Sequence, residues 1–237
     1  MEKISNKLIP NKKEPDPYFY EKVLWDQQAY VCGVDEVGRG CLAGPVIAAA
    51  VILHPFANHP FLKDSKILSE KKREEVAAWI KKNSWYSYGN ANNGHVDTYN
   101  VYQATQKAMK SALYNLFSQH NILPKTELIL IDAMPLNISH LTKPVPILSF
   151  PFGESRSVSI AAASILAKVK RDKLITRVSS FFPGYSFEIH KGYGTKKHFD
   201  ALKQKGASLM HRLTFIQKQL QGASHEQPKD SQTKLFC

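Results

Sequence analysis

Four acidic residues stand where an apolar segment ends or a long helix is about to begin. Asp35 and Glu36 close one apolar segment, Asp132 directly follows the run "LILI", and Glu154 lies just before an alanine-rich stretch. A carboxylate near a sheet interior is costly unless it is paired or holds a metal. Because hard divalent cations prefer oxygen ligands, the four acids predict a site for one or two such ions.

The adjacent pair of acids leaves a geometric question open. In a regular strand Asp35 and Glu36 point to opposite faces, so they share one ion only if the strand twists or ends there. The pair is followed by Gly38-Arg39-Gly40. A plain hairpin turn explains the two glycines but not the arginine between them.

The segments around these acids alternate between strand-like and helix-like patterns. We expect strands at 30–36, 46–53, 86–91, 128–131 and 146–150. We expect helices at 20–28, 69–82, 97–119, 157–177 and 195–206, with Ser69 as an N-cap. Small residues on the fourth helix predict close packing against the sheet, and the alternation favours an α/β domain.

Composition narrows the class of protein. The chain has 237 residues, enough for one domain with a sizeable core, and 43% of them are hydrophobic. It has neither a membrane-length apolar run nor the apolar core of a signal peptide, and its three cysteines are too few for a disulfide framework. We therefore expect a cytoplasmic protein with reduced thiols and no membrane partner.

The formal net charge of +12 favours a polyanionic partner such as nucleic acid, although a solvated basic surface is the alternative. Three parts are expected along the chain. Residues 1–29 read as an N-terminal arm with a short helix, residues 30–220 as the main domain, and residues 221–237 as a disordered tail.

Five segments resemble, in order, the motifs of bacterial ribonuclease HII, a type 2 ribonuclease H family. They are "GVDEVGRGCLAGPVIAAAVIL", "KDSKILSEKKREE", "LILIDA", "GESRSVSIAAASILAKVKRD" and "HKGYGTKKHFDALKQKGASLMHRLTF". The resemblance implies an RNase H-like fold, with a mixed central sheet flanked by helices and a helical C-terminal part. It also implies a monomeric endonuclease that uses Mg²⁺ or Mn²⁺ to cut RNA in RNA/DNA hybrids and at ribonucleotides embedded in duplex DNA. Two-metal hydrolysis of this kind leaves a 5′-phosphate and a 3′-hydroxyl.

The resemblance also assigns roles to residues of this sequence. The family's metal-holding carboxylates correspond to Asp35, Glu36 and Asp132, with Asp35 the expected bridging ligand. Glu154 fills the place of a fourth acid that is usually aspartate, and its longer side chain changes the distance to a second metal. The remaining candidates contact nucleic acid: Gly38, Arg39 and Gly40 at the ribose 2′-hydroxyl, Tyr193 stacked on the sugar at the RNA-to-DNA junction, and Lys66, Lys191, Lys196 and Arg212 at phosphates.

Two alternative functions remain open. Ribonuclease HIII often has glutamate as its fourth acid, but it carries an added N-terminal domain for which residues 1–29 are too short. A non-catalytic basic nucleic-acid-binding protein would keep the charge without needing the four acids. His190, His198 and His211 match no common zinc spacing, so we do not expect a zinc site.

The chain ends in "QTKLFC", which places two apolar residues on an otherwise polar tail. Gln232, Leu235 and Phe236 resemble the Gln-x-x-Leu-Phe peptide by which bacterial repair proteins bind the replicative sliding clamp. The alternative is a chance pentapeptide. The resemblance predicts a weak tether that raises local concentration at DNA.

Overall fold

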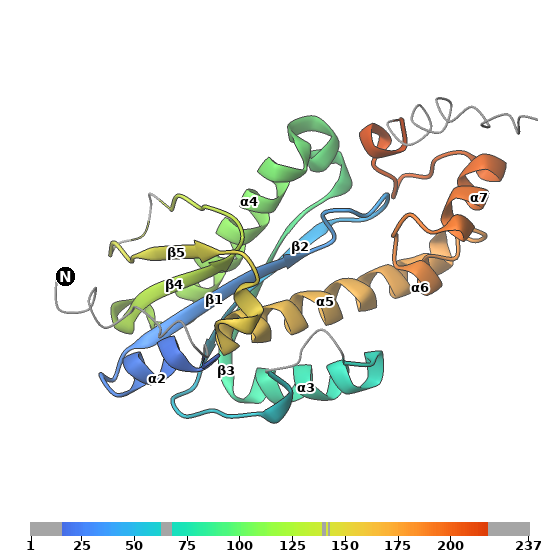
Figure 1. The fold of residues 1–237 in the computed structure, drawn as a ribbon. Coiled ribbons are helices and arrows are strands. Elements are labelled where there is room, and N and C mark those ends of the chain that lie inside the picture. The colour runs from blue at the N-terminus through green and yellow to red at the C-terminus, as the bar shows by residue number, and fades with distance from the viewer. Residues whose placement is uncertain (1–15, 63–67, 139–140, 142, 218–237) are drawn as a thin grey trace, which may run out of the picture.

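A mixed five-stranded sheet forms the centre of the molecule, in the order β3-β2-β1-β4-β5 (Figure 1). The computed structural model describes residues 16–62, 68–138, 141 and 143–217. The strands are β1 (Tyr30–Val37), β2 (Val46–Leu53), β3 (Ser84–Ala91), β4 (Thr126–Asp132) and β5 (Ile147–Phe150). The first three pair antiparallel, whereas β4 runs parallel to both β1 and β5. The expected mixed sheet of an α/β fold is confirmed.

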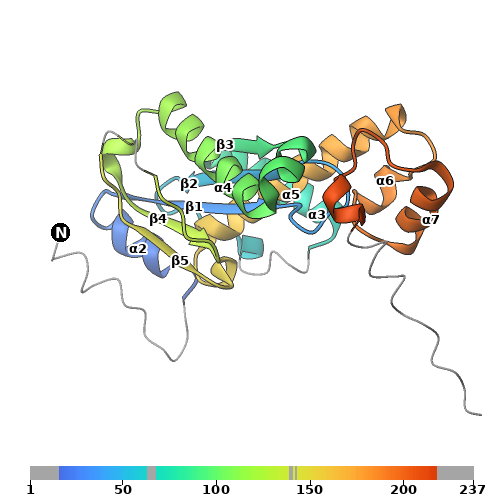
Figure 2. The same ribbon diagram turned by 90° about the horizontal axis from the view of Figure 1, so that it is seen from above.

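The helices are α2 (Phe19–Trp25), α3 (Glu70–Lys82), α4 (Asn93–Gln119), α5 (Val158–Val178), α6 (Phe187–His190) and α7 (Lys196–Lys205). The last two gather at one end of the molecule, beyond the β1–β2 hairpin, and form the helical C-terminal part (Figure 2). No helix within the described ranges is both long and apolar enough to cross a membrane.

Side-chain caps explain where the helices begin. Ser69 and Ser157 accept hydrogen bonds from the amides of the third residues that follow them, at 3.3 Å each. The expected start of α4 at residue 97 was four residues late, because Asn92 Oδ1 already accepts from the His95 amide at 2.8 Å. Helix α6 was not predicted, since four residues are too few to show a helical period.

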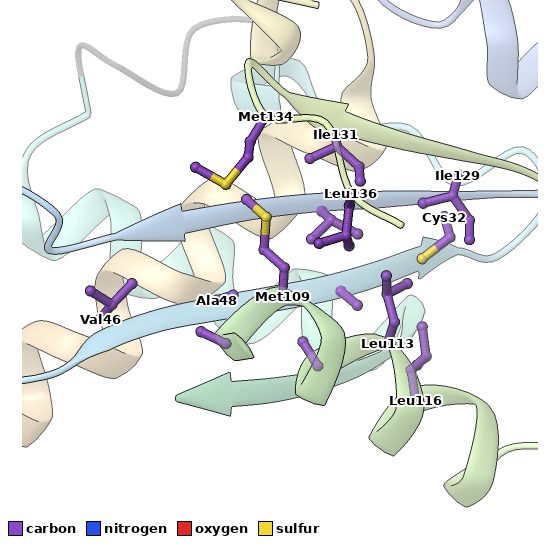
Figure 3. Packing of buried hydrophobic residues seen from close by; sticks show 14 of the residues in the cluster. Cys32, Val46, Ala48, Met109, Leu113, Leu116, Ile129, Ile131, Met134 and Leu136 are labelled. Atoms are coloured by element: carbon purple, nitrogen blue, oxygen red, sulfur yellow. The ribbon is translucent and has the colours of Figure 1, made fainter. Parts of the chain in front are cut away.

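Helices cover both faces of the sheet. Helix α4 packs on one face, where Met109, Leu113 and Leu116 meet Ala48 of β2 and Ile131 of β4 (Figure 3). On the other face α3 and α5 pack against the alternate residues of β2, including Ala49 and Val51. Because strand side chains alternate between faces, this division fixes which way each residue of β1 points.

The small-residue surface of α5 allows that helix to lie directly on β1, as expected. Ala161, Ala162 and Ala163 are fully buried. A Cβ at Gly33 of β1 would lie 2.1 Å from the carbonyl carbon of Ser159, so only glycine permits this approach. The close contact brings the beginning of α5 onto the middle of β1, two residues before Asp35.

Helix α2 packs on the domain, with Tyr20, Leu24 and Trp25 buried. It also carries a buried acid that sequence reasoning missed. Glu21 Oε1 accepts from Ser157 Oγ at 2.6 Å and from the Ser159 amide at 3.0 Å. The carboxyl group accepts from two donors at the N-terminus of α5, and these hydrogen bonds oppose the larger effect of burial, which raises the pKa of Glu21.

Candidate active site

Asp35 and Asp132 lie side by side at the ends of two parallel strands. The register of β1 and β4 pairs Val34 with Ile131, and its continuation brings Asp35 next to Asp132. Asp35 is also paired with Ala49, which belongs to the core under α3 and α5. Both aspartates therefore lie near the carboxyl ends of two neighbouring strands, and Asp35 faces α5.

Glu154 reaches the aspartates from a short 3-10 turn, Gly153–Ser155, between β5 and α5. The Gly153 amide donates to Asp132 Oδ1 at 2.8 Å, which ties this turn to the end of β4. One carboxylate oxygen from each of Asp35, Asp132 and Glu154 lies within 4.8 Å of the other two. The structure thus brings together three of the four acids as one candidate metal-binding group.

Glu36 is not part of that group. It pairs with Ala48, which belongs to the core under α4, so its side chain leaves the opposite face of β1. Its Oε1 accepts from Arg39 Nη1 at 3.3 Å, while Oε2 is buried with no hydrogen-bond partner among the described residues. Strand β1 continues through Val37 and so does not end at the pair. A ligand role for Glu36 stays a prediction.

Each acidic side chain in this region disfavours the ionised form of its neighbours. Burial raises the pKa of Asp35 well above its ordinary value, the charge of Glu36 and then that of Asp132 raise it further, and a hydrogen bond with Ser164 opposes the shift. Burial also raises the pKa of Glu36, against the opposing effect of Arg39. A divalent cation would offset this repulsion, and an all-carboxylate donor set suits a hard cation. The residues present therefore fit the expected metal ions.

The glycine turn, residues 38–45, connects β1 to β2 beside these acids. Gly38 has a φ of +95°, a conformation that favours glycine. Arg39 is exposed and forms an ion pair with Glu36. Its guanidinium is therefore accessible to a phosphate at the edge of the acidic group.

The expectation that Arg212 contacts a phosphate is wrong for this structure. The side chain is fully buried beneath the glycine turn. Its Nη1 donates to the Arg39 carbonyl at 2.8 Å, and its Nε and Nη2 donate to the Gly44 carbonyl at 3.0 and 2.8 Å. Burial lowers the pKa of Arg212 to about 10. The same region holds Arg171, a second buried arginine that carried no signal in the sequence.

The other nucleic-acid candidates differ in accessibility. Tyr193 is 37% exposed, and its segment lies against the glycine turn because the Leu42 amide donates to the Gly192 carbonyl at 2.9 Å. Lys191 Nζ donates to Thr176 Oγ1 and to the Glu188 carbonyl, at 2.7 Å each, so a phosphate would have to replace these partners. The exposed Lys196 begins α7. Outside the described residues lie Lys66, Gln232, Leu235 and Phe236.

The three histidines form a buried cluster next to Tyr193. The rings of His190 and His198 stack with centroids 4.2 Å apart. His198 Nδ1 lies 2.8 Å from the Tyr193 carbonyl, and its Nε2 lies 3.0 Å from Nε2 of His211. His211 Nδ1 accepts from the Ser208 amide at 2.8 Å. A single set of neutral tautomers satisfies this chain: His211 donates to His198, which donates to Tyr193.

Comparison with known proteins places this geometry in a family. The family model described as Ribonuclease HII matches residues 32–218. A relative named Ribonuclease HII from Caldanaerobacter subterraneus subsp. tengcongensis is 43% identical over 213 residues, which cover 89% of this chain and 84% of that protein. Another of that name from Ligilactobacillus salivarius is 47% identical over 198 residues, covering 82% of this chain and 73% of the relative.

Solved structures have the same fold at lower identity. The RNase HII in a PCNA:RNase HII complex from Archaeoglobus fulgidus superposes with a TM-score of 0.56 at 23% identity, covering 79% of this chain and 94% of that chain. Bst-RNase HIII in complex with Mn²⁺ gives a TM-score of 0.61 at 19% identity, covering 94% and 80%. These likenesses confirm the RNase H-like fold. With the curated relatives, they establish that the chain belongs to the ribonuclease HII family of ribonuclease H endonucleases.

Proposed function

We propose that this enzyme cuts the RNA strand of RNA/DNA hybrids and cuts at single ribonucleotides embedded in duplex DNA, leaving a 5′-phosphate and a 3′-hydroxyl. The observation that carries the proposal is the grouping of Asp35, Asp132 and Glu154 within 4.8 Å of one another. The glycine turn starts three residues after Asp35, so the acidic group and the turn can engage one nucleotide.

Asp35, Asp132 and Glu154 would hold Mg²⁺ or Mn²⁺, and Glu36, whose charge acts on Asp35, would be the further ligand that the family resemblance implies. Bound metal ions would supply an activated water, stabilise the leaving 3′ oxygen and neutralise the phosphate. The Gly153 amide holds Asp132 Oδ1 at 2.8 Å and would fix the position of that ligand oxygen. A Mn²⁺ complex of an RNase HIII of the same fold is consistent with this ligand chemistry.

Residues around the acids would determine the substrate specificity. The backbone amides of the glycine turn would approach the ribose 2′-hydroxyl, which alone separates RNA from DNA at a given position. Arg39 would bind a neighbouring phosphate, and Tyr193 would pack on the sugar beyond it. The three groups lie on one connected surface, since the Tyr193 segment is hydrogen bonded to the turn.

We also propose that the tail ending in Gln232, Leu235 and Phe236 binds the replicative sliding clamp. The sequence resemblance supports this, as does the existence of a PCNA complex of another RNase HII.

A duplex with one ribonucleotide tests the main proposal. We expect cleavage on the 5′ side of the ribonucleotide with Mg²⁺ or Mn²⁺, and no cleavage of the matched all-DNA duplex. A hybrid with a longer RNA stretch serves as the comparison substrate. If only the longer stretch is cut, the enzyme has the substrate preference expected of ribonuclease HIII. If neither is cut, the proposed function is wrong.

A further inference from the structure

We propose that Arg171 and Arg212 are positioning residues. They hold the glycine turn and the Tyr193 segment, residues 191–193, together as one unit that recognises ribose. The proposal rests on the proposed function, because the unit matters only if the substrate contains ribose. Neither arginine touches the acidic group, and neither is exposed to a phosphate. They would act through the main chain that surrounds them.

Arg171 connects three separate parts of the chain from its place on α5. Its Nη2 donates to the Ala43 carbonyl at 2.9 Å, and its Nε donates to the Pro45 carbonyl at 3.0 Å. Its Nη1 donates to the Lys191 carbonyl at 2.8 Å, which lies in the Tyr193 segment. Its Cζ lies 5.7 Å from the centre of the Tyr193 ring, within the range of a cation–π contact. One guanidinium therefore determines the spacing between the turn and Tyr193.

Arg212, in the C-terminal part, holds the same glycine turn through further hydrogen bonds. It contributes three hydrogen bonds, to the carbonyls of Arg39 and Gly44. Its own amide donates to the Leu42 carbonyl at 2.8 Å. The amides of Leu42 and Ala43 donate to the Gly192 carbonyl and that of Gly44 donates to the Met210 carbonyl, so this half of the turn is held through both its donors and its acceptors. Arg212 thus spans the turn from Arg39 to Gly44, while Arg171 holds its second half at Ala43 and Pro45.

The charge of the pair is unusual. Both side chains are fully buried, and among the described residues neither guanidinium forms an ion pair with a carboxylate. Burying a charge without a counter-ion is costly, so stability alone does not account for two of them. Partly uncompensated positive charge under the turn would favour an anion above it, and a nucleic-acid phosphate has that charge.

A lysine cannot replace either residue. The guanidinium is a planar fork with donors at fixed angles, and Arg171 uses three different nitrogens on three carbonyls. Space is also tight, because a Cβ at Gly38 would lie 2.3 Å from Arg171 Nε. Lysine would keep the positive charge but lose most of the hydrogen bonds. The conservative variant therefore separates charge from positioning.

The test compares Arg171→Lys and Arg212→Lys with the wild type and with Arg39→Gln. We expect kcat on the single-ribonucleotide duplex to fall by about tenfold or more in both lysine variants. The preference for binding that duplex over the matched all-DNA duplex should fall in parallel. The dependence of log affinity on log salt should be unchanged, whereas Arg39→Gln should reduce its slope by about one.

Hydrogen exchange tests the structural part independently of activity. We expect the amides of Leu42 and Ala43 to lose protection in the lysine variants, while the amides of β2 keep theirs. Unchanged protection together with unchanged ribose preference would overturn the proposal, as would a reduced salt slope, which indicates direct phosphate contacts. If the wild-type enzyme does not cut the duplex, the proposed function fails, and hydrogen exchange still decides whether the arginines hold the turn.

Discussion

The main-chain amide of Gly153 donates a hydrogen bond of 2.8 Å to Oδ1 of Asp132. This bond joins the end of β4 to the turn that carries Glu154. A Cβ at Gly153 would lie 2.7 Å from Ile160 Cδ1 and 3.2 Å from the same carboxylate oxygen. The distance between Asp132 and Glu154 therefore depends on the absence of a side chain at residue 153.

Gly153→Ala should displace the turn by a few tenths of an ångström and reduce kcat by about tenfold, because catalytic geometry tolerates little displacement. The melting temperature should change little, since Ile160 can adjust its side-chain end. Gly94→Ala is the matched control: its Cβ would meet nothing closer than 3.7 Å. Wild-type kcat in Gly153→Ala would show that the turn does not position Glu154.

Asp35→Asn should reduce cleavage about a thousandfold or more while leaving hybrid affinity nearly unchanged, because affinity comes mostly from phosphate contacts elsewhere. In metal-free protein the substitution removes a charge from a buried acidic group, so the melting temperature should rise. Added Mn²⁺ should stabilise the wild type but not the variant. Near-wild-type turnover in Mg²⁺ would contradict the metal assignment.

Glu154 allows a test of side-chain length against charge. Glu154→Gln should lower turnover by about a hundredfold, because the amide keeps the shape but loses the charge that binds a cation. Glu154→Asp restores the acid common in the family and should cost less than about tenfold. Single-turnover cleavage of the single-ribonucleotide duplex measures both. If Glu154→Gln has no effect, the site operates with the other acids alone.

The histidine cluster should make the fold sensitive to acid. Burial lowers the pKa of His198 and of His211 from 6.5 to about 4. The unfolded chain therefore binds protons first as the pH falls, and the free energy of unfolding should drop between pH 6.5 and 4, by up to about 3 kcal/mol for each histidine. Urea unfolding across this range measures the drop. A His198→Asn variant should show a shallower dependence, and an unchanged slope would contradict the shifted pKa values.

A labelled peptide of residues 226–237 should bind the sliding clamp of the same organism weakly and saturably. Leu235→Ala/Phe236→Ala is the control, because it removes both apolar anchors and should abolish binding. Absence of saturation up to roughly 100 μM, which corresponds to about 5–6 kcal/mol, would leave the tail without this role.

Local chemistry made much of this protein predictable from its sequence. Apolar runs and helical periodicity located the five strands of the described sheet and the longer helices, and the N-cap Ser69 marked the start of α3. Acids at the ends of apolar runs, together with the family motifs, predicted a shared site for four acids, and the structure groups three of them, Asp35, Asp132 and Glu154. These features depend on neighbours in the chain, so a single sequence contains them.

Contacts between distant segments decided the rest. The alternation of a strand already placed Asp35 and Glu36 on opposite faces, but only the sheet register and the covering helices decided that Asp35 faces α5 and Glu36 lies on the α4 side. Burial reversed the expectation for Arg212, whose donors bind carbonyls more than 160 residues away in the chain. A positive charge in a sequence predicts an exposed side chain, because arginine is rarely buried, and only the packing of the whole chain removed Arg212 from solvent.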